Sequence, residues 1–167
     1  MIWRDMSGFP EASRAQARLA GILDSWEGTP YAPGQQMKGA GVDCVRFVCG
    51  VLDECYGSKR IPVPELPGDI ALHQRGTAIA AMRFIMELYK PNAAVTDEVL
   101  EPGDIVVVGP AGGGPGHAMI VGARTNELWH STDRRVQMTG LGFLQQHSHG
   151  YSLFGVYRAL DRERWVA

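Results

Sequence analysis

The stretch DCVRFVCGVLDECYG, residues 43–57, predicts an α-helix with a defined beginning and end. Asp43 is a preferred N-cap residue, so Cys44 would occupy the first helical position. Gly57 is a common residue at a helix C-terminus, which ends the helix after Tyr56. Between these ends the apolar side chains recur at steps of three or four residues, as on one helix face: Val45, Val48, Leu52 and Cys55.

The three cysteines of the chain, Cys44, Cys49 and Cys55, all lie in this helix. An odd number at these spacings does not form a disulfide framework, and the absence of a CxxC pair disfavours a structural zinc site. We interpret Cys49 and Cys55 as small buried hydrophobic residues. Cys44 has a different position, at the start of the helix.

The rest of the chain predicts a single α+β domain over residues 1–167. Two more helices are expected, at Glu11–Trp26 and at Thr77–Tyr89, and a glycine-rich loop at Tyr31–Val42. Short β-rich runs follow, separated by Gly, Asn or Asp: Ile105–Val108, Ala118–Val121, Glu127–His130, Val136–Met138 and Leu153–Tyr157. Because helices come first and strands later, we expect N-terminal helices packed on a small antiparallel β-sheet.

Composition excludes several classes of protein. Of 167 residues, 45% are hydrophobic and 20% are charged, with a formal net charge of -2. Lys and Arg are scattered, so we expect no nucleic-acid partner. No apolar run reaches about 18 residues, so we expect no membrane span. The N-terminus has no apolar segment after a basic start, so no secretory signal is expected. Synthesis would be cytoplasmic, and a substrate outside the cell would require another delivery route.

Cys44 is the candidate nucleophile. A helix N-terminus lowers thiol pKa, because its unpaired N–H groups and partial positive charge favour the thiolate that attacks carbonyl carbon. The glycine-rich loop before Cys44 leaves room for a substrate backbone. A structural role for a cysteine at a helix start is the alternative.

Histidines supply the second part of the pattern. His117 precedes the expected strand Ala118–Val121, and His130 ends the expected strand Glu127–His130. If these strands form a hairpin, the two side chains come roughly opposite each other on one face. His117 would then act as base and His130 would orient its imidazole.

Three alternatives remain for these histidines. His117 can be a solvated strand-end residue, and His130 can bond a neighbouring loop. Both can bind a metal ion if Cys44 joins them as the third ligand. The other histidines are interpreted as surface residues: His73, His147 and His149.

Taken together, several blocks resemble the NlpC family of cell-wall cysteine peptidases, which have a papain-like α+β fold. The blocks are GTPY at 28–31, DCVRFV at 43–48, PGDIVVV at 102–108, GHAMIVG at 116–122 and LWHS at 128–131. The longer string at 43–57 is similar to the phage and gene-transfer-agent branch of the family. That branch implies association with a virion or tail and with phage-tail-like proteins.

The resemblance implies a role for each matching residue. Cys44 would be the nucleophile, His117 the base and His130 the third polar residue. Tyr31 would line the site and hold the substrate or the oxyanion through its hydroxyl. Asp43 would contribute to the pocket for the amino end of the substrate. The implied substrate is the peptide stem of bacterial peptidoglycan, and no cofactor or metal is implied.

Two adjacent positions depart from the family pattern. Many members have Ser-Gly after the Asp-Cys pair, whereas this chain has Val45 and Arg46. Arg46 can bind a carboxylate of the substrate, or it can be a solvated side chain on the first helical turn. The functional alternatives are an amidase or transferase on the same fold, such as an interbacterial toxin, and a tail or assembly component without catalysis.

Overall fold

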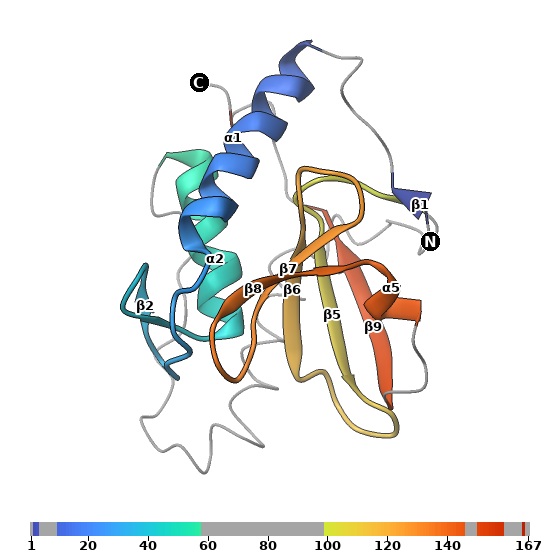
Figure 1. Ribbon diagram of the computed structural model, residues 1–167. Helices are drawn as coiled ribbons and strands as arrows, with labels where there is room; N and C mark the ends of the chain where they lie inside the picture. The colour runs from blue at the N-terminus through green and yellow to red at the C-terminus, as the bar shows by residue number, and fades with distance from the viewer. Residues whose placement is uncertain (1, 4–9, 58–98, 146–149, 159–164, 166–167) are drawn as a thin grey trace.

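The computed structural model describes residues 2–3, 10–57, 99–145, 150–158 and 165 (Figure 1). Helix α1 (Pro10–Trp26) and helix α2 (Cys44–Tyr56) pack beside a five-stranded sheet in the order β8-β7-β6-β5-β9. The strands are β5 (Ile105–Pro110), β6 (His117–Val121), β7 (Glu127–Ser131), β8 (Val136–Gly140) and β9 (Tyr151–Tyr157). All neighbours in this sheet are antiparallel.

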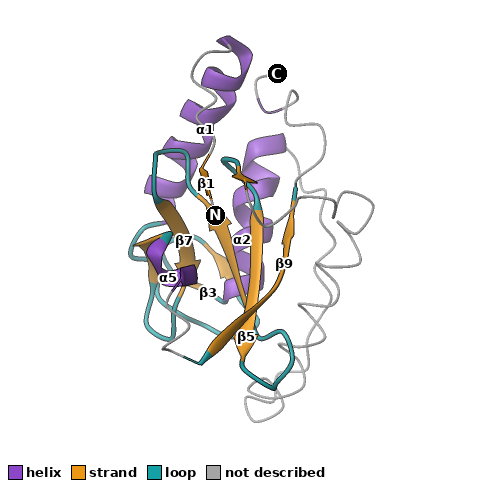
Figure 2. Ribbon diagram, turned by 90° about the vertical axis from the view of Figure 1, so that its right-hand side faces the viewer, coloured by secondary structure: helices purple, strands orange, loops and turns teal. Residues whose placement is uncertain are grey.

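Short elements surround this centre. Figure 2 shows the helices and strands from a second side. The remaining described elements are β1 (Ile2–Trp3), β2 (Gln36–Met37), β3 (Gly41–Val42), β4 (Val99–Leu100) and α5 (Gly142–Gln145). β1 pairs in parallel with β4, and β2 pairs antiparallel with β3. The region expected to be a loop before Asp43 therefore contains a small hairpin.

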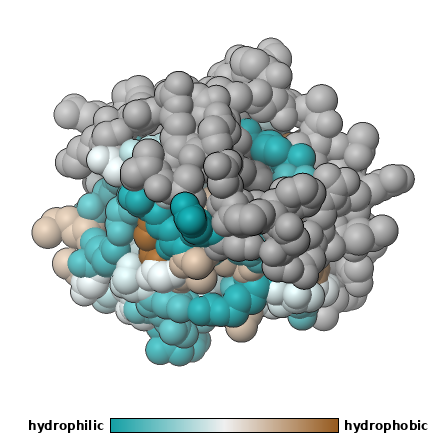
Figure 3. Space-filling model, turned by 90° about the horizontal axis from the view of Figure 1, so that it is seen from above, coloured by the Kyte–Doolittle hydropathy of each residue, from teal (hydrophilic) through white to brown (hydrophobic). Residues whose placement is uncertain are grey.

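The expected α+β architecture is confirmed, and the expected helices and strands in the described ranges are present. Their ends differ from the expected ones by at most two residues. The expected helix Thr77–Tyr89 lies outside the described residues. Within the described part, no helix is long and apolar enough to cross a membrane. Seen from above in Figure 3, the described surface mixes hydrophilic areas with weakly apolar ones, and the most hydrophobic spot is small.

Strands β5 and β6 are buried on both faces, which explains why they are continuous apolar runs instead of alternating ones. Ile105, Val107, Ala118 and Ile120 pack with the helices, while Val106, Val108, Met119 and Val121 face the other side. Phe143 and Leu144 of α5 pack on that second side. Strands β5 and β6 therefore hold the two halves of the molecule together.

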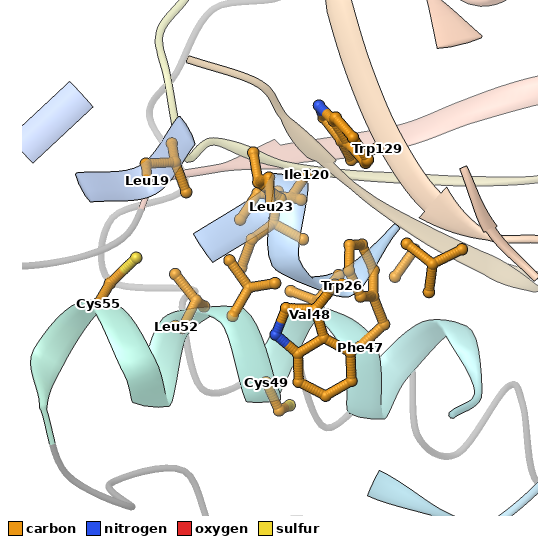
Figure 4. Close-up of a cluster of buried hydrophobic side chains, with 14 of the residues drawn as sticks. Leu19, Leu23, Trp26, Phe47, Val48, Cys49, Leu52, Cys55, Ile120 and Trp129 are labelled. Atoms are coloured by element: carbon orange, nitrogen blue, oxygen red, sulfur yellow. The ribbon is translucent and has the colours of Figure 1, made fainter. Parts of the chain in front are cut away.

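The larger core lies between α1, α2 and the sheet (Figure 4). Trp26 and Phe47 meet edge to face, with ring centroids 5.8 Å apart. Cys49 and Cys55 are 1% and 0% exposed, as expected for small buried hydrophobes. Burial of α2 in this core fixes the position of its first residue, Cys44.

An ion pair between a partly exposed arginine and a buried carboxylate joins the chain after β9 to the start of β5. Asp104 is fully buried, and the Arg158 Nε and Nη2 atoms donate to its two oxygens at 3.0 Å each. The backbone N–H of Glu101 also donates to Asp104. The PGD block thus has a structural role, because it closes the turn that leads into β5.

We predict that Asp104→Asn lowers the free energy of unfolding by roughly 2–3 kcal/mol, since it removes the buried carboxylate that accepts two bonds from Arg158 and leaves only Glu101, 3.2 Å from Nη1, as its anionic partner in the described part of the chain. The matched control is Asp24→Asn, which breaks the ion pair with Arg124 at a site where both side chains are about half exposed. That variant should lose no more than about 1 kcal/mol. Urea unfolding measures both, and equal losses would contradict the structural role of Asp104.

Candidate active site

Cys44 is the first residue of α2, as expected. Asp43 is the N-cap, with φ -93° and ψ 172°, and its side chain accepts the backbone N–H of Arg46 at 2.9 Å. The thiol of Cys44 is partly buried and interacts with the backbone N–H of Ala118 on β6. The first turn of α2 therefore meets β6 at its beginning, next to His117.

His117 and His130 form a hydrogen-bonded pair. The Nε2 atom of His117 lies 2.8 Å from Nδ1 of His130, and the rings meet edge to face. Strand β6 pairs with β7 through Ile120 opposite Trp129, so the same register sets His130 across from Met119. The two histidines are thus diagonal neighbours on one face of the sheet, which confirms their expected proximity.

The hydrogen bond between the rings permits one arrangement suited to a base. If Nε2–H of His117 donates to Nδ1 of His130, Nδ1 of His117 keeps a free lone pair. His130 then carries its own proton on Nε2. That atom is buried and has no hydrogen-bond partner among the described residues. The Phe143 ring lies beside it, with ring centroids 6.0 Å apart.

Cys44 and the histidine pair approach the start of β6 from different sides. Ala118 faces the helices, whereas Met119, on the same side as His117, faces the second core. Among the described side chains, the Cys44 thiol makes no hydrogen bond to the His117 ring. Catalytic hydrogen bonds are often long without substrate and shorten when it binds. The candidate site is therefore at the end of β6, not over the middle of the sheet.

Burial controls the charge of both groups. Burial, and then the charge of His130, lowers the pKa of His117 to about 3. Burial raises the pKa of the Cys44 thiol to about 11, with a further contribution from Asp43. The free site therefore holds a neutral thiol and a neutral imidazole at neutral pH.

The expected lowering of the Cys44 pKa by the helix N-terminus is therefore wrong in its net direction. The backbone N–H groups of Ala118, Val45 and Cys44 do favour the thiolate, but the loss of hydration outweighs them. The thiol must lose its proton during attack, in a step that requires a base.

Tyr31 lies at the same site. Burial raises the pKa of its hydroxyl, and so do the charges of Cys44, Asp43 and Asp133. The hydroxyl therefore stays protonated and can donate a hydrogen bond. Its side chain is 37% exposed, which leaves it accessible to a ligand.

The backbone on both sides of Tyr31 is fixed. Its N–H donates to the carbonyl of Arg134 at 2.9 Å, and it forms a bridge with Val42. The Ser131 hydroxyl donates to the carbonyl of Val42 at 3.0 Å. These bonds join the turn after His130 to the segment before Cys44, so the two parts of the site are held together.

Arg46 is buried, so the solvated alternative for this residue is wrong. Its guanidinium Nη1 contacts Asp43 Oδ2 at 2.6 Å, and both side chains are less than a tenth exposed. Asp43 Oδ2 also accepts the backbone N–H of Gly34 at 2.9 Å. The arginine therefore already binds a carboxylate, that of Asp43, and the Asp43 oxygens are occupied within the chain.

A metal centre has no support in the described residues. No group of three His, Cys, Asp or Glu side chains lies close enough to hold a metal ion there, Cys44, His117 and His130 included. The remaining histidines, His73, His147 and His149, lie outside the described residues.

Two contributors to the site, Asp133 and Arg134, lie outside the motifs that predicted the other site residues. The turn after β7 fixes Tyr31 through Arg134, and Asp133 in the same turn acts on the Tyr31 hydroxyl. Both follow the LWHS block directly, so a hairpin continued beyond Ser131 could have indicated them.

Comparison with solved structures identifies the fold. The NlpC/p60 domain of the peptidoglycan hydrolase SagA matches with a TM-score of 0.52 and 15% identity, over 86% of this chain and 98% of that one. A protein from Staphylococcus aureus, described as similar to a lipoprotein of the NLP/P60 family, has a TM-score of 0.48 and 18% identity. The match with this second protein covers 86% of our chain and 41% of the other chain. No profile of a protein family and no curated protein matches the sequence. The fold is thus the expected NlpC type.

We predict that Arg46→Ser lowers the free energy of unfolding by about 3 kcal/mol, because it leaves a buried carboxylate without its cation. The double variant Asp43→Asn/Arg46→Met should lose much less, since it removes both charges and keeps an N-cap. Arg14→Ser, on the exposed surface of α1, serves as the control. Urea unfolding gives all three values, and a stabilised Arg46→Ser protein would argue against the buried pair.

We also predict how alkylation of Cys44 by iodoacetamide depends on pH. Only the thiolate reacts, so with a pKa of about 11 the rate should keep rising between about pH 6 and pH 10. A thiolate–imidazolium pair would instead give a rate that is constant across this range. Mass spectrometry of the labelled peptide follows the reaction, and Cys44→Ala should abolish the labelling.

Proposed function

We propose that this chain is a cysteine peptidase that hydrolyses an amide bond in the peptide stem of bacterial peptidoglycan. One observation carries the proposal: Cys44, at a helix N-terminus, contacts the backbone of β6 at Ala118, and the preceding residue is His117, whose imidazole a second imidazole orients. The NlpC-type fold supports it. A structural cysteine requires neither the histidine pair nor the nearby tyrosine hydroxyl.

The geometry supports acyl transfer in two steps. The Cys44 thiol gives its proton to Nδ1 of His117 as sulfur attacks the scissile carbonyl carbon. His117 then donates this proton to the leaving amine, which leaves a thioester on Cys44. In the second step His117 takes a proton from water as the water oxygen attacks the thioester carbonyl. The C–S bond then breaks, the acid leaves, and His117 returns the proton to the Cys44 sulfur.

Two hydrogen-bond donors are available for the negative oxygen of the intermediate. The backbone N–H of Cys44 has no partner within the helix, because it lies in the first turn. The Tyr31 hydroxyl stays protonated near the thiol. Donors fixed before the reaction stabilise this charge without reorganising during it.

The hydrogen bond between the histidines has its largest effect when His117 is charged. Burial disfavours the imidazolium, so a bond from its Nε2–H to His130 Nδ1 lowers the cost of the proton transfer. Neutral His130 thus positions the base and stabilises its protonated form, whereas a charged His130 would oppose it.

The proposal extends to the biological setting. The similarity of residues 43–57 to the phage and gene-transfer-agent branch supports a role on a phage tail, which would deliver the enzyme to the cell wall. Detection of the chain in purified particles by mass spectrometry would test this extension. An amidase or transferase on the same fold, and a tail component without catalysis, are the rivals.

Digestion of purified cell-wall fragments tests the reaction. Mass spectrometry of the products should show stem peptides with one amide bond hydrolysed and with new amino and carboxyl ends. Transfer to an added amine, with no free acid, would favour a transferase. Intact stems after long incubation would favour the assembly component.

We predict that Cys44→Ala lowers turnover by about 10⁴-fold or more while the unfolding midpoint stays close to that of the parent protein. The control is Cys55→Ser, at a fully buried position away from the site. It should lower stability by about 1–3 kcal/mol and keep turnover per folded molecule. Full activity of Cys44→Ala would exclude it as the nucleophile.

We predict different losses for the two histidines. His117→Asn removes the base and should lower kcat by at least about 10³-fold. His130→Asn keeps one group able to hydrogen-bond the His117 ring, so its loss should stay below about 10²-fold. Steady-state kinetics on one stem peptide compares the two, with unfolding midpoints as the fold control. Equal and total losses would reject the proposed division of roles.

A further inference from the structure

The buried pair of Asp43 and Arg46 bears on which stem peptides the site accepts. Asp43 directly precedes the nucleophile, and its negative charge acts on both the Cys44 thiol and the Tyr31 hydroxyl. A carboxylate in this position is suited to bind a positively charged group of a bound peptide. In this chain, a cation from the protein already holds it.

Both carboxylate oxygens of Asp43 already accept hydrogen bonds from within the chain. Oδ1 accepts the backbone N–H of Arg46, and Oδ2 accepts both the backbone N–H of Gly34 and the Arg46 guanidinium. Asp43 is 4% exposed and Arg46 is 6% exposed. A ligand ammonium would have to displace the guanidinium from this buried ion pair, and breaking a buried pair costs free energy.

The other carboxylate whose charge acts on Tyr31 belongs to Asp133. It lies in the exposed turn after β7, where water and salt weaken its attraction for a cation. A free amino end would therefore lose hydration at this site without gaining a strong ion pair. An acylated amino end has no charge to desolvate.

We infer that Arg46 acts as a built-in counter-ion at Asp43, so that the site selects peptide stems whose amino end is acylated. This inference rests on the proposed function. Stems that are still joined to the glycan strand have such an uncharged amide at their amino end, whereas released stem peptides carry an ammonium group. Arg46 is thus a specificity-determining residue.

Two synthetic stem peptides that differ only in a free or an acetylated amino end test the inference. At about pH 6.5 the free amino group is protonated, because its pKa is about 7.7–8.0. The wild-type chain should cleave the acetylated peptide with a kcat/KM about tenfold higher or more, equivalent to about 1.4 kcal/mol. This preference should shrink as the pH rises above about 8 and the amine loses its charge.

Variants at Arg46 test whether its charge causes the preference for the acetylated peptide. Arg46→Gln keeps a hydrogen-bond donor for Asp43 but removes the cation, so the preference for the acetylated peptide should disappear or reverse. Arg46→Lys keeps the charge and should keep the preference. Arg14→Gln, on exposed α1, removes the same charge elsewhere and should change nothing.

The outcomes separate this inference from the proposed function. Cleavage of both peptides with equal kcat/KM, or better cleavage of the free-amine peptide by the wild-type chain, would overturn the inference alone. So would an unchanged preference in a folded Arg46→Gln protein. If that variant fails to fold, the wild-type comparison and its pH dependence still decide. Cleavage of neither peptide would overturn the proposed function and the inference with it.

Discussion

The candidate site depends on one contact, the packing of the first turn of α2 against the beginning of β6. The apolar face of α2 and residues such as Ala118 and Ile120 share one core, so neither element can move without opening it. Because Cys44 is the first residue of α2 and His117 the first of β6, this core sets their separation. The bond from Ser131 to Val42 then joins the strand that bears His130 to the segment that leads into α2.

The same packing sets the electrostatics of the site. Burial holds the Cys44 thiol and the His117 imidazole neutral, although helix amides favour the thiolate. A neutral pair makes the nucleophile less reactive before a substrate arrives, and it makes proton transfer part of the attack. The orientation of His117 by His130 therefore matters more here than in a site with a preformed ion pair.

Local patterns predicted the fold because they repeat and have clear ends. The cap at Asp43 and the glycine at 57 define α2, and the strands are separated by turn residues. The histidine contact was predictable because alternation puts both rings on one face of the sheet. The direction of the Cys44 pKa shift and the partner of Arg46 were not, since both depend on burial, which tertiary packing decides. The bond between Asp104 and Arg158 joins residues 54 positions apart and has no local signal.

The ion pair beside the nucleophile requires an explanation beyond stability. A buried pair is often no more stabilising than apolar residues of similar volume, and Asn caps a helix about as well as Asp. A neutral cap at position 43 and an apolar residue at position 46 would therefore give similar stability. What the pair adds is a charged but compensated carboxylate next to Cys44. An uncompensated Asp43 would oppose the developing thiolate and attract cations to the site. Because Arg46 pairs with this carboxylate, it bears on the chemistry of the site and, through the proposed selection of acylated stems, on its choice of substrate.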